Sequence, residues 1–355
     1  MELRRLSLAP ALLWGTSRAG NSLTRASAGW LVSGLSTSPL VNSVLMALAT
    51  LPALLPLQRG TRGYLAQLVG VVGLIGLTLG QSSLRIPDAW LVAPVLLAVL
   101  LFAFGQEISQ LPLQRQLLPK AGATVERLRI GNELGAMAGN LLEAVIFPAM
   151  AQFSSALVLL LPLGLSSLQS APPLDTTAEA RSNHTPELVP FSRRCALQGV
   201  LFGSLFAVLP LWLREVCGAS YFDFGLLLAG YCLGRSLNGL IPSWGNVLNY
   251  AAMAALLVLA EALGDSRVVA VFLPLGALAA ASDVALVASM QPLGDAALRW
   301  EILLRSGGVG GLIGSLGMGL LSQLLGISVV MPLQVGLFLV LAWPLGRCAW
   351  TPPSS

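Results

Sequence analysis

The sequence predicts an all-α polytopic membrane protein with about twelve transmembrane helices in two pseudo-symmetric six-helix halves. The 355 residues are 55% hydrophobic and only 10% charged, whereas soluble domains carry about 25% charged residues. The mean hydropathy is +0.78. One helical span needs about 20 apolar residues, so about twelve spans fit the chain with short loops. One long polar stretch divides these spans into two sets of six.

The apolar runs give the positions of the spans in order along the chain. In the first half they are expected at residues 8–33, 39–57, 63–80, 89–105, 130–150 and 152–168. In the second half they are expected at residues 194–213, 222–241, 246–263, 267–290, 304–324 and 327–346. Residues 169–193 are rich in Pro, Ser, Thr and charge, which predicts a flexible linker. The expected domains are therefore 1–168, a cytoplasmic linker 169–193, and 194–355.

The fifth and eleventh predicted spans resemble each other in their small residues. The fifth reads "RIGNELGAMAGNLLEAV" and the eleventh "LRSGGVGGLIGSLGMGL". A shift of 175 residues aligns three positions: Gly135 with Gly310, Gly139 with Gly314, and Asn140 with Ser315. Small residues four apart let two helices approach closely in lipid. Their equivalent placement favours an internal repeat of six spans.

The basic residues predict the orientation. With the N-terminus inside, fifteen of the 20 Lys and Arg residues fall on the inner side, three fall in outer loops, and Arg18 and Arg25 lie within the first span. Such a bias is typical of cytoplasmic loops, so both termini are expected in the cytoplasm. The same bias accounts for the basic isoelectric point of about 9.2 without a nucleic-acid partner.

The sequence lacks the patterns of the common enzyme classes. It has no phosphate-binding Gly-x-x-x-x-Gly-Lys motif, no Gly-x-Ser-x-Gly and no HExxH. The single histidine, His184, lies in the predicted linker, and the four cysteines form no CxxC. We therefore expect no enzyme, no metal site and no cofactor.

Two stretches resemble the major facilitator superfamily, and within it the branch of enterobactin exporters and macrolide-efflux permeases. The first is Ser17 to Leu55, where the branch's pattern corresponds to Arg18, Gly20, Asn21, Trp30-Leu31-Val32 and Ser38-Pro39. The second is Leu111 to Leu134, which resembles the loop between spans 4 and 5 through Arg115, Pro119, Arg129 and Asn132. In the second half the resemblance rests mainly on the helix layout.

The chain departs from this family in its gate loop between spans 2 and 3. The family's Gly-x-x-x-Asp-Arg-x-Gly-Arg-Arg pattern is shortened here to "PLQRGTRGYL", without the Asp. Arg59 and Arg62 remain as gate-loop candidates. The equivalent loop between spans 8 and 9, "IPSWGNVLNY", is also short and uncharged. Ion-driven rocking by the family's usual latch is therefore in question.

Polar and charged residues inside the spans are the candidates for substrate binding or coupling, because such residues are costly in a bilayer. They are Arg18, Asn21, Arg25, Glu133, Asn140 and Asp283. The first three share one helix face, and Glu133 shares a face with Asn140. Structural roles are the alternative, including a pair of Glu133 with Arg18 or Arg25. Glu143 is expected near the outer end of its span, in contact with solvent.

The resemblance implies a permease of the bacterial inner membrane that exports a small amphipathic or anionic molecule by alternating access. Its partners would be the lipid bilayer, the substrate, and a proton or sodium ion for coupling. The shortened loops motivate a different hypothesis, a scaffold or assembly factor derived from a transporter fold. A polar-lined cavity that closes at either end would favour the transporter.

Overall fold

The computed structural model describes residues 2–55, 57–58, 60–84, 86–121, 125–169, 190–237, 246–291 and 296–346. These residues form twelve α-helices and two short 3₁₀ helices, and they contain no strand. The first six α-helices are α1 (Glu2–Leu35), α2 (Pro39–Thr50), α3 (Gly63–Leu84), α4 (Asp88–Ala121), α5 (Val125–Val145) and α6 (Ala149–Gln169). The 3₁₀ helix η1 (Leu51–Leu54) extends α2.

The other six α-helices follow the predicted linker. They are α8 (Arg193–Glu215), α9 (Tyr221–Ser236), α10 (Asn246–Leu263), α11 (Val268–Ser289), α12 (Ala296–Leu325) and α13 (Val330–Gly346). The 3₁₀ helix η4 (Ile327–Val329) precedes α13. Each predicted span corresponds to one helix, so the predicted fold class is confirmed. Most of the predicted linker lies outside the described residues.

Several helix boundaries differ from the predicted span ends, and three of them are informative. Helices α4 and α12 extend well beyond the apolar runs at 89–105 and 304–324. Helix α5 ends at Val145, five residues before the predicted end at 150. Pro148 lies just after this end, and proline disfavours a helical conformation of the residue before it. Apolarity alone could not locate these helix ends.

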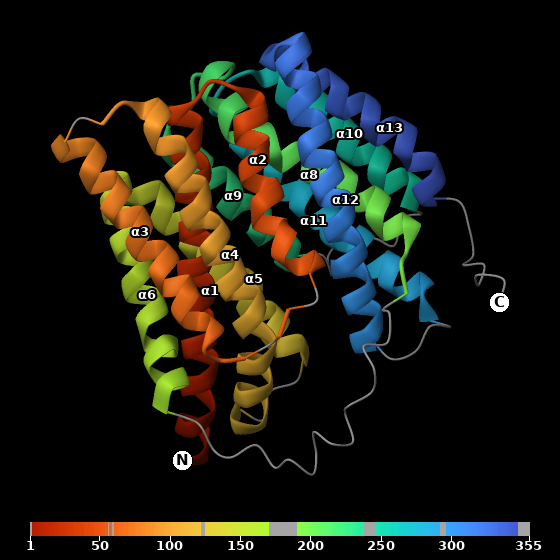
Figure 1. The fold of residues 1–355 in the computed structure, drawn as a ribbon. Helices are drawn as coiled ribbons and strands as arrows, with labels where there is room; N and C mark the ends of the chain where they lie inside the picture. The colour runs from red at the N-terminus through yellow and green to blue at the C-terminus, as the bar shows by residue number, and fades with distance from the viewer. Residues whose placement is uncertain are drawn as a thin grey trace.

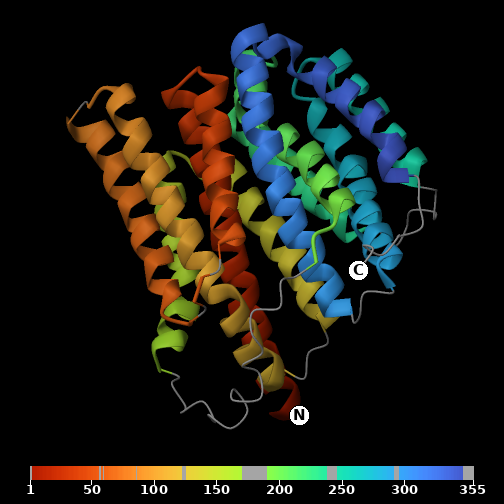
Figure 2. The ribbon, with the colours of Figure 1, turned by 45° about the vertical axis from the view of Figure 1, so that its right-hand side comes forward.

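The helices form two groups that lie side by side, α1–α6 and α8–α13 (Figures 1 and 2). Corresponding helices pack in the same way in each group: α1 on α5 as α8 on α12, and α3 on α4 as α10 on α11. The most extensive contacts between the groups are those of α5 with α9 and of α2 with α12, and α1 and α2 also contact α8. Each group also has its own apolar core, one around Tyr64 and Phe102 and the other around Trp212 and Phe272.

Seven of the described helical segments are long and apolar enough to cross a membrane, and α2 with η1 and α6 form shorter apolar helices. Helices α1, α5 and α9 belong neither to the segments apolar enough to cross a membrane nor to the shorter apolar helices. They carry charged residues, with Arg18 and Glu133 well inside α1 and α5 and Arg235 in the last turn of α9. In a membrane protein such residues face the inside of a bundle. The least apolar helices are therefore where a functional site is expected.

The glycines of the predicted repeat lie in two equivalent helix contacts. On Gly139 of α5, a Cβ atom would collide with the carbonyl oxygen of Ala19 in α1. On Gly314 of α12, it would collide with the carbonyl oxygen of Val200 in α8. Glycine thus allows backbone-to-backbone packing at both places. We call these contacts the α1–α5 seam and the α8–α12 seam.

Adding one methyl group to a seam should destabilise the protein, whereas the same change outside the seam should not. Gly314→Ala forces α12 away from Val200, and overpacking of this kind costs about 1–3 kcal/mol. Gly317→Ala, three residues further along α12, places its Cβ in open space. We expect thermal unfolding in detergent to begin at a lower temperature for Gly314→Ala alone. Equal unfolding temperatures for the two variants would contradict the close approach.

Candidate functional site

Three charged side chains meet where the two groups of helices join. Arg235 of α9 contacts Glu133 of α5 through Nε at 3.2 Å and Asp283 of α11 through Nη2 at 2.9 Å. The three side chains are 25%, 16% and 15% exposed, respectively. Hydrogen bonds between ionised groups are among the strongest in proteins. We call Glu133, Arg235 and Asp283 the charge triad.

Close helix packing brings the triad together. A Cβ on Gly234, the residue before Arg235, would collide with the carbonyl oxygen of Leu273 in α11. Helix α9 can therefore approach α11 closely enough for a direct ion pair. Arg235 also lies in the last turn of α9, where the helix dipole favours a positive charge. From the other side, Gln198 of α8 donates a 2.6 Å hydrogen bond to Asp283.

Asn140 lies in the middle of a second polar connection. Its Oδ1 accepts a hydrogen bond of 2.7 Å from Ser22 of α1, and its Nδ2 donates to Cys232 of α9 at 3.4 Å. The residue is only 4% exposed. Asn140 thus bridges three helices, two from one group and one from the other. Like the triad, Asn140 lies on the contact between α5 and α9, about two turns further along α5.

The predicted stripe on α1 points mainly to its own group of helices. Arg25 donates to Gln106 of α4 at 2.9 Å, and Asn21 accepts a hydrogen bond from Gln67 of α3. The guanidinium of Arg18 lies 5.7 Å from the ring centre of Trp14. The expected pair of Glu133 with Arg18 or Arg25 is not the ion pair that forms, because Glu133 contacts Arg235 instead. Whether these residues bind substrate stays a prediction.

The structure adds little on the shortened gate loop. Arg62 is exposed just before α3, and Arg59 lies outside the described residues, as does the equivalent loop at 238–245. A gating role for Arg59 and Arg62 therefore stays a prediction.

The two groups are joined firmly on the side where α1 ends and α2 begins. Trp30 of α1 stacks on Phe224 of α9 with ring centres 5.5 Å apart, and Arg214 of α8 lies 4.2 Å over the Trp30 ring. Arg214 also donates to the carbonyl oxygen of Trp30 at 2.9 Å. Cation–π contact, stacking and a hydrogen bond thus close this side. We call it the sealed side.

Two further contacts strengthen the sealed side. Phe147, just after α5, stacks on Tyr221 of α9 with ring centres 4.8 Å apart. Ser38, at the start of α2, donates a 2.8 Å hydrogen bond to Gln323 of α12. Each contact joins one group of helices to the other.

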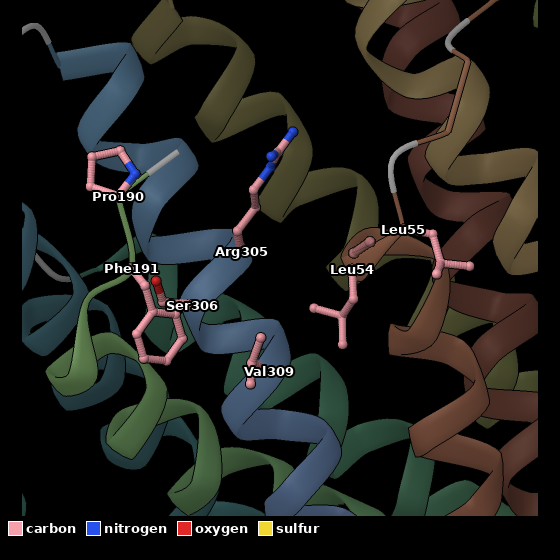
Figure 3. A pocket seen from close by; sticks show the side chains of 8 residues that line it. Leu54, Leu55, Pro190, Phe191, Arg305, Ser306 and Val309 are labelled. Atoms are coloured by element: carbon pink, nitrogen blue, oxygen red, sulfur yellow. The ribbon is translucent and has the colours of Figure 1, made fainter. Parts of the chain in front are cut away.

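On the opposite side, a pocket of about 190 Å³ lies between the groups. Leu54 and Leu55, at the end of η1, lie on one side of it, and Phe191 and Val309 lie on the other (Figure 3). Arg305 and Ser306 of α12 supply the polar atoms of the lining. Arg305 is 47% exposed and pairs with Glu301 at 3.1 Å. The pocket therefore combines apolar walls with an exposed cation.

Glu143 is completely buried, contrary to the expectation that it contacts solvent. Its exposure is 0%, and neither carboxylate oxygen has a hydrogen-bond partner. The residue is two positions before the end of α5, so its predicted depth was reasonable. The prediction was wrong about the direction of the side chain, because Glu143 lies on a face of α5 that packs against the protein interior.

Arg235 and Gln198 are the site residues that the sequence interpretation missed. Arg235 had been counted among the basic residues of the inner side, although it lies within the predicted span at 222–241. A signal was present, because two acids within spans, Glu133 and Asp283, need a positive partner. Gln198 had no such signal, since a single amide near a helix start is common.

Solved structures with the same fold are membrane transporters. A bacterial homologue of the human lysosomal transporter Spinster, in an inward-facing and occupied conformation, has 14% identity, a TM-score of 0.63 and 99% coverage of both chains. A bacterial metal transporter has 14% identity and a TM-score of 0.63, with 96% of this chain and 98% of that chain covered. The nucleoside transporter NupG has 15% identity and a TM-score of 0.56, with 97% of both covered.

No protein-family model and no curated protein matches the chain. At these identities the structural likeness establishes the fold alone, the helical fold of these transporter structures, and seven of the described helical segments are long and apolar enough to cross a membrane. The likeness does not distinguish the enterobactin-exporter branch.

Loss of Arg235 should be the most destabilising change within the triad. Arg235→Gln leaves two carboxylates close together, and breaking a buried ion pair by removing one partner costs about 3–5 kcal/mol. Glu133→Gln should cost less, since Arg235 keeps Asp283. We expect this order in thermal unfolding in detergent, and partial recovery in the double variant Arg235→Gln/Asp283→Asn.

The matched control is Arg267→Gln, because Arg267 is 72% exposed in its ion pair with Asp265. Exposed pairs contribute about 0–1 kcal/mol, so this variant should unfold like the wild type. A loss for Arg235→Gln no larger than that of the control would show that the triad contributes nothing to stability.

Glu143→Gln should raise stability, in contrast to Glu133→Gln. A carboxyl group buried without a partner costs free energy at neutral pH, because it must either stay charged or take up a proton, and a neutral amide avoids this cost. We expect a gain of at least about 1 kcal/mol, visible as a higher unfolding temperature at neutral pH. A drop as large as that of Glu133→Gln would mean that Glu143 has an essential partner.

Proposed function

We propose that the protein is a secondary transporter that moves a small amphipathic or anionic molecule across the membrane by alternating access. The observation that carries this proposal is the charge triad between the two groups of helices, with the sealed side on one face and the pocket on the other. A transporter whose central site opens to one side of the membrane at a time must be closed on one face while it is open on the other. The transporter fold of the structural neighbours supports it.

The predicted orientation in the membrane indicates which side of this conformation faces the cytoplasm. With both termini in the cytoplasm, the pocket beside Arg305 opens inward and the Trp30–Arg214 contact closes the outer side. The solved Spinster homologue is itself described as inward-facing and occupied. Residues 1–168 and 194–355 would be the two moving halves, joined by the linker at 169–193.

The pocket supports the substrate class. Its walls are mostly apolar, with Leu54, Leu55, Phe191 and Val309, and its half-exposed cation, Arg305, would exchange its present partner Glu301 for the substrate. An apolar body with a negative group complements both features. Export, as in the efflux branch that the sequence resembles, is the proposed direction.

The buried polar residues are the proposed machinery. Arg18, Asn21, Arg25 and Asn140 would contact the substrate when the halves separate. Glu133 and Asp283 would carry a coupling proton or bind a coupling sodium ion, since acids inside a bundle mark ion pathways. Arg235 would hold them until the halves move.

A reversible lock across the sealed side tests the proposal. Ser38→Cys/Gln323→Cys, in a variant without the native cysteines, places two thiols where a hydrogen bond now joins the groups. Oxidation should keep this side closed and stop export, and a reductant should restore export. Metabolites in cells and medium are compared among a strain without the protein, a strain with the lock, and strains with Ser38→Cys or Gln323→Cys alone.

A compound retained without the protein, released with the reduced lock and retained again after oxidation would support alternating access and identify the substrate. The single-cysteine variants should export under both conditions. Identical metabolite profiles in all strains, with membrane expression confirmed, would contradict the transporter and favour the scaffold hypothesis.

A further inference from the structure

A second, much smaller cavity lies within the first group of helices, between α1, α3 and α4. It measures about 10 Å³, which is room for about one water-sized sphere. Polar side chains surround it, among them Arg18, Asn21, Gln67 and Gln106, together with the indole of Trp14. This concentration of polar groups inside a membrane bundle calls for an occupant that satisfies them.

The buried side-chain atoms of this cavity that lack a hydrogen-bond partner are all N–H donors. Trp14 is 2% exposed, and its Nε1 has no partner. The Nη1 atom of Arg18 is also buried without a partner. Among the residues that line the cavity, all of which the structure describes, these two are the buried side-chain atoms left unpaired. An occupant therefore needs to accept hydrogen bonds and has little need to donate them.

The other polar groups are already engaged with one another. Ser17 contacts the Tyr64 hydroxyl at 2.9 Å, which in turn donates to the carbonyl oxygen of Leu160 at 3.0 Å. Gln67 donates to Asn21, and Gln106 accepts from Arg25. A water molecule would bring two O–H donors to acceptors that are mostly occupied, whereas an anion brings none.

The electrostatics favour the same conclusion. No Asp or Glu lines the cavity, and Arg18 brings a guanidinium to it. The nearby charges that act on Arg18 are a second cation, Arg25, and Glu133. Glu133 is already paired with Arg235. The cavity thus carries positive charge without a neutralising group in its walls, and in a low-dielectric interior this strongly attracts an anion.

We propose that this cavity binds one halide ion, chloride under ordinary conditions, through the Nε1 of Trp14 and the Nη1 of Arg18. The cavity is far too small for a carboxylate or phosphate unless the helices separate, whereas a chloride ion, which is slightly larger than a water molecule, fits once the lining side chains yield slightly. The bound ion would stabilise α1 against α3 and α4. This site is separate from the pocket beside Arg305, and although Arg18 and Asn21 are also proposed substrate contacts, chloride binding can be measured without transport.

Thermal unfolding of the purified protein in detergent tests the proposal. Sodium chloride is titrated against sodium gluconate at constant ionic strength, so that only the small anion changes. A ligand that binds the folded state raises the unfolding temperature, so chloride should raise it in a saturable way. Arg18→Gln should remove this chloride effect, and the exposed control Arg267→Gln should keep it.

Trp14→Phe is the sharper variant, because it keeps an aromatic ring and removes the N–H donor. A hydrogen bond to a charged group contributes enough that its loss should weaken chloride binding about tenfold or more. Bromide, which quenches indole fluorescence at contact, gives a second measurement. The saturable part of the quenching should disappear in Trp14→Phe, although the chain retains seven of its eight tryptophans.

Wild-type protein that unfolds at the same temperature in chloride and gluconate, with no saturable quenching by bromide, would overturn the proposal and leave water as the occupant. An undiminished chloride effect in Trp14→Phe would also overturn it, since the ion would then bind elsewhere. Either result leaves the transport experiment with the Ser38–Gln323 lock unaffected.

Discussion

A guanidinium group between packed helices is costly without acids beside it, and the position of Arg235 between two acids satisfies this constraint. The acids come from α5 in one group of helices and α11 in the other. The requirement therefore fixes the distance between α9 and both neighbours, and with it the relation of the two groups at their centre. Gly234 makes the approach sterically feasible, because its carbonyl neighbour on α11 leaves no room for a side chain.

The helices differ in hydrophobicity according to whether they must hold charged residues. The outer helices, such as α3 and α13, are apolar enough to cross a membrane on composition alone. Helices α1, α5 and α9 are not, and these are the ones that hold Arg18, Glu133 and Arg235. They can be polar because neighbouring helices, rather than lipid, surround their polar faces. The apolar cores of the two groups support this inner layer from both sides.

The sequence predicted the fold well, because a helical span is a local property. The twelve apolar runs and the glycines at 135, 139, 310 and 314 were readable without any three-dimensional information, and the glycines do lie in equivalent seams. The site was predicted only in part. Glu133 and Asp283 were recognised as acids within spans, but the partner of Glu133 was sought on α1 instead of α9.

The remaining errors have a common physical origin. Periodicity shows which residues share a helix face, but it does not show which neighbour that face meets. Glu143 was assigned the right depth and the wrong direction for this reason. Arg235 was counted toward the orientation bias, and its distance from the end of the apolar run was overlooked. The N–H groups of Trp14 and Arg18 lack a hydrogen-bond partner because of the distances between helices, and these distances cannot be read from a single sequence.

The two glycine seams also determine which parts of the molecule can move. Where backbone packs directly on backbone, no side chain lies between the helices that could change its rotamer. We therefore expect α1 and α5 to move together as one unit, and α8 and α12 as another. A rotation of one group against the other, as the proposed transport requires, would therefore fall on the contacts between the groups, which join α5 to α9, α2 to α8 and α12, and α1 to α8 and α9. Arg235 and Asp283 belong to the same group, so such a rotation would change the contact between Arg235 and Glu133 and leave the pair of Arg235 with Asp283 in place.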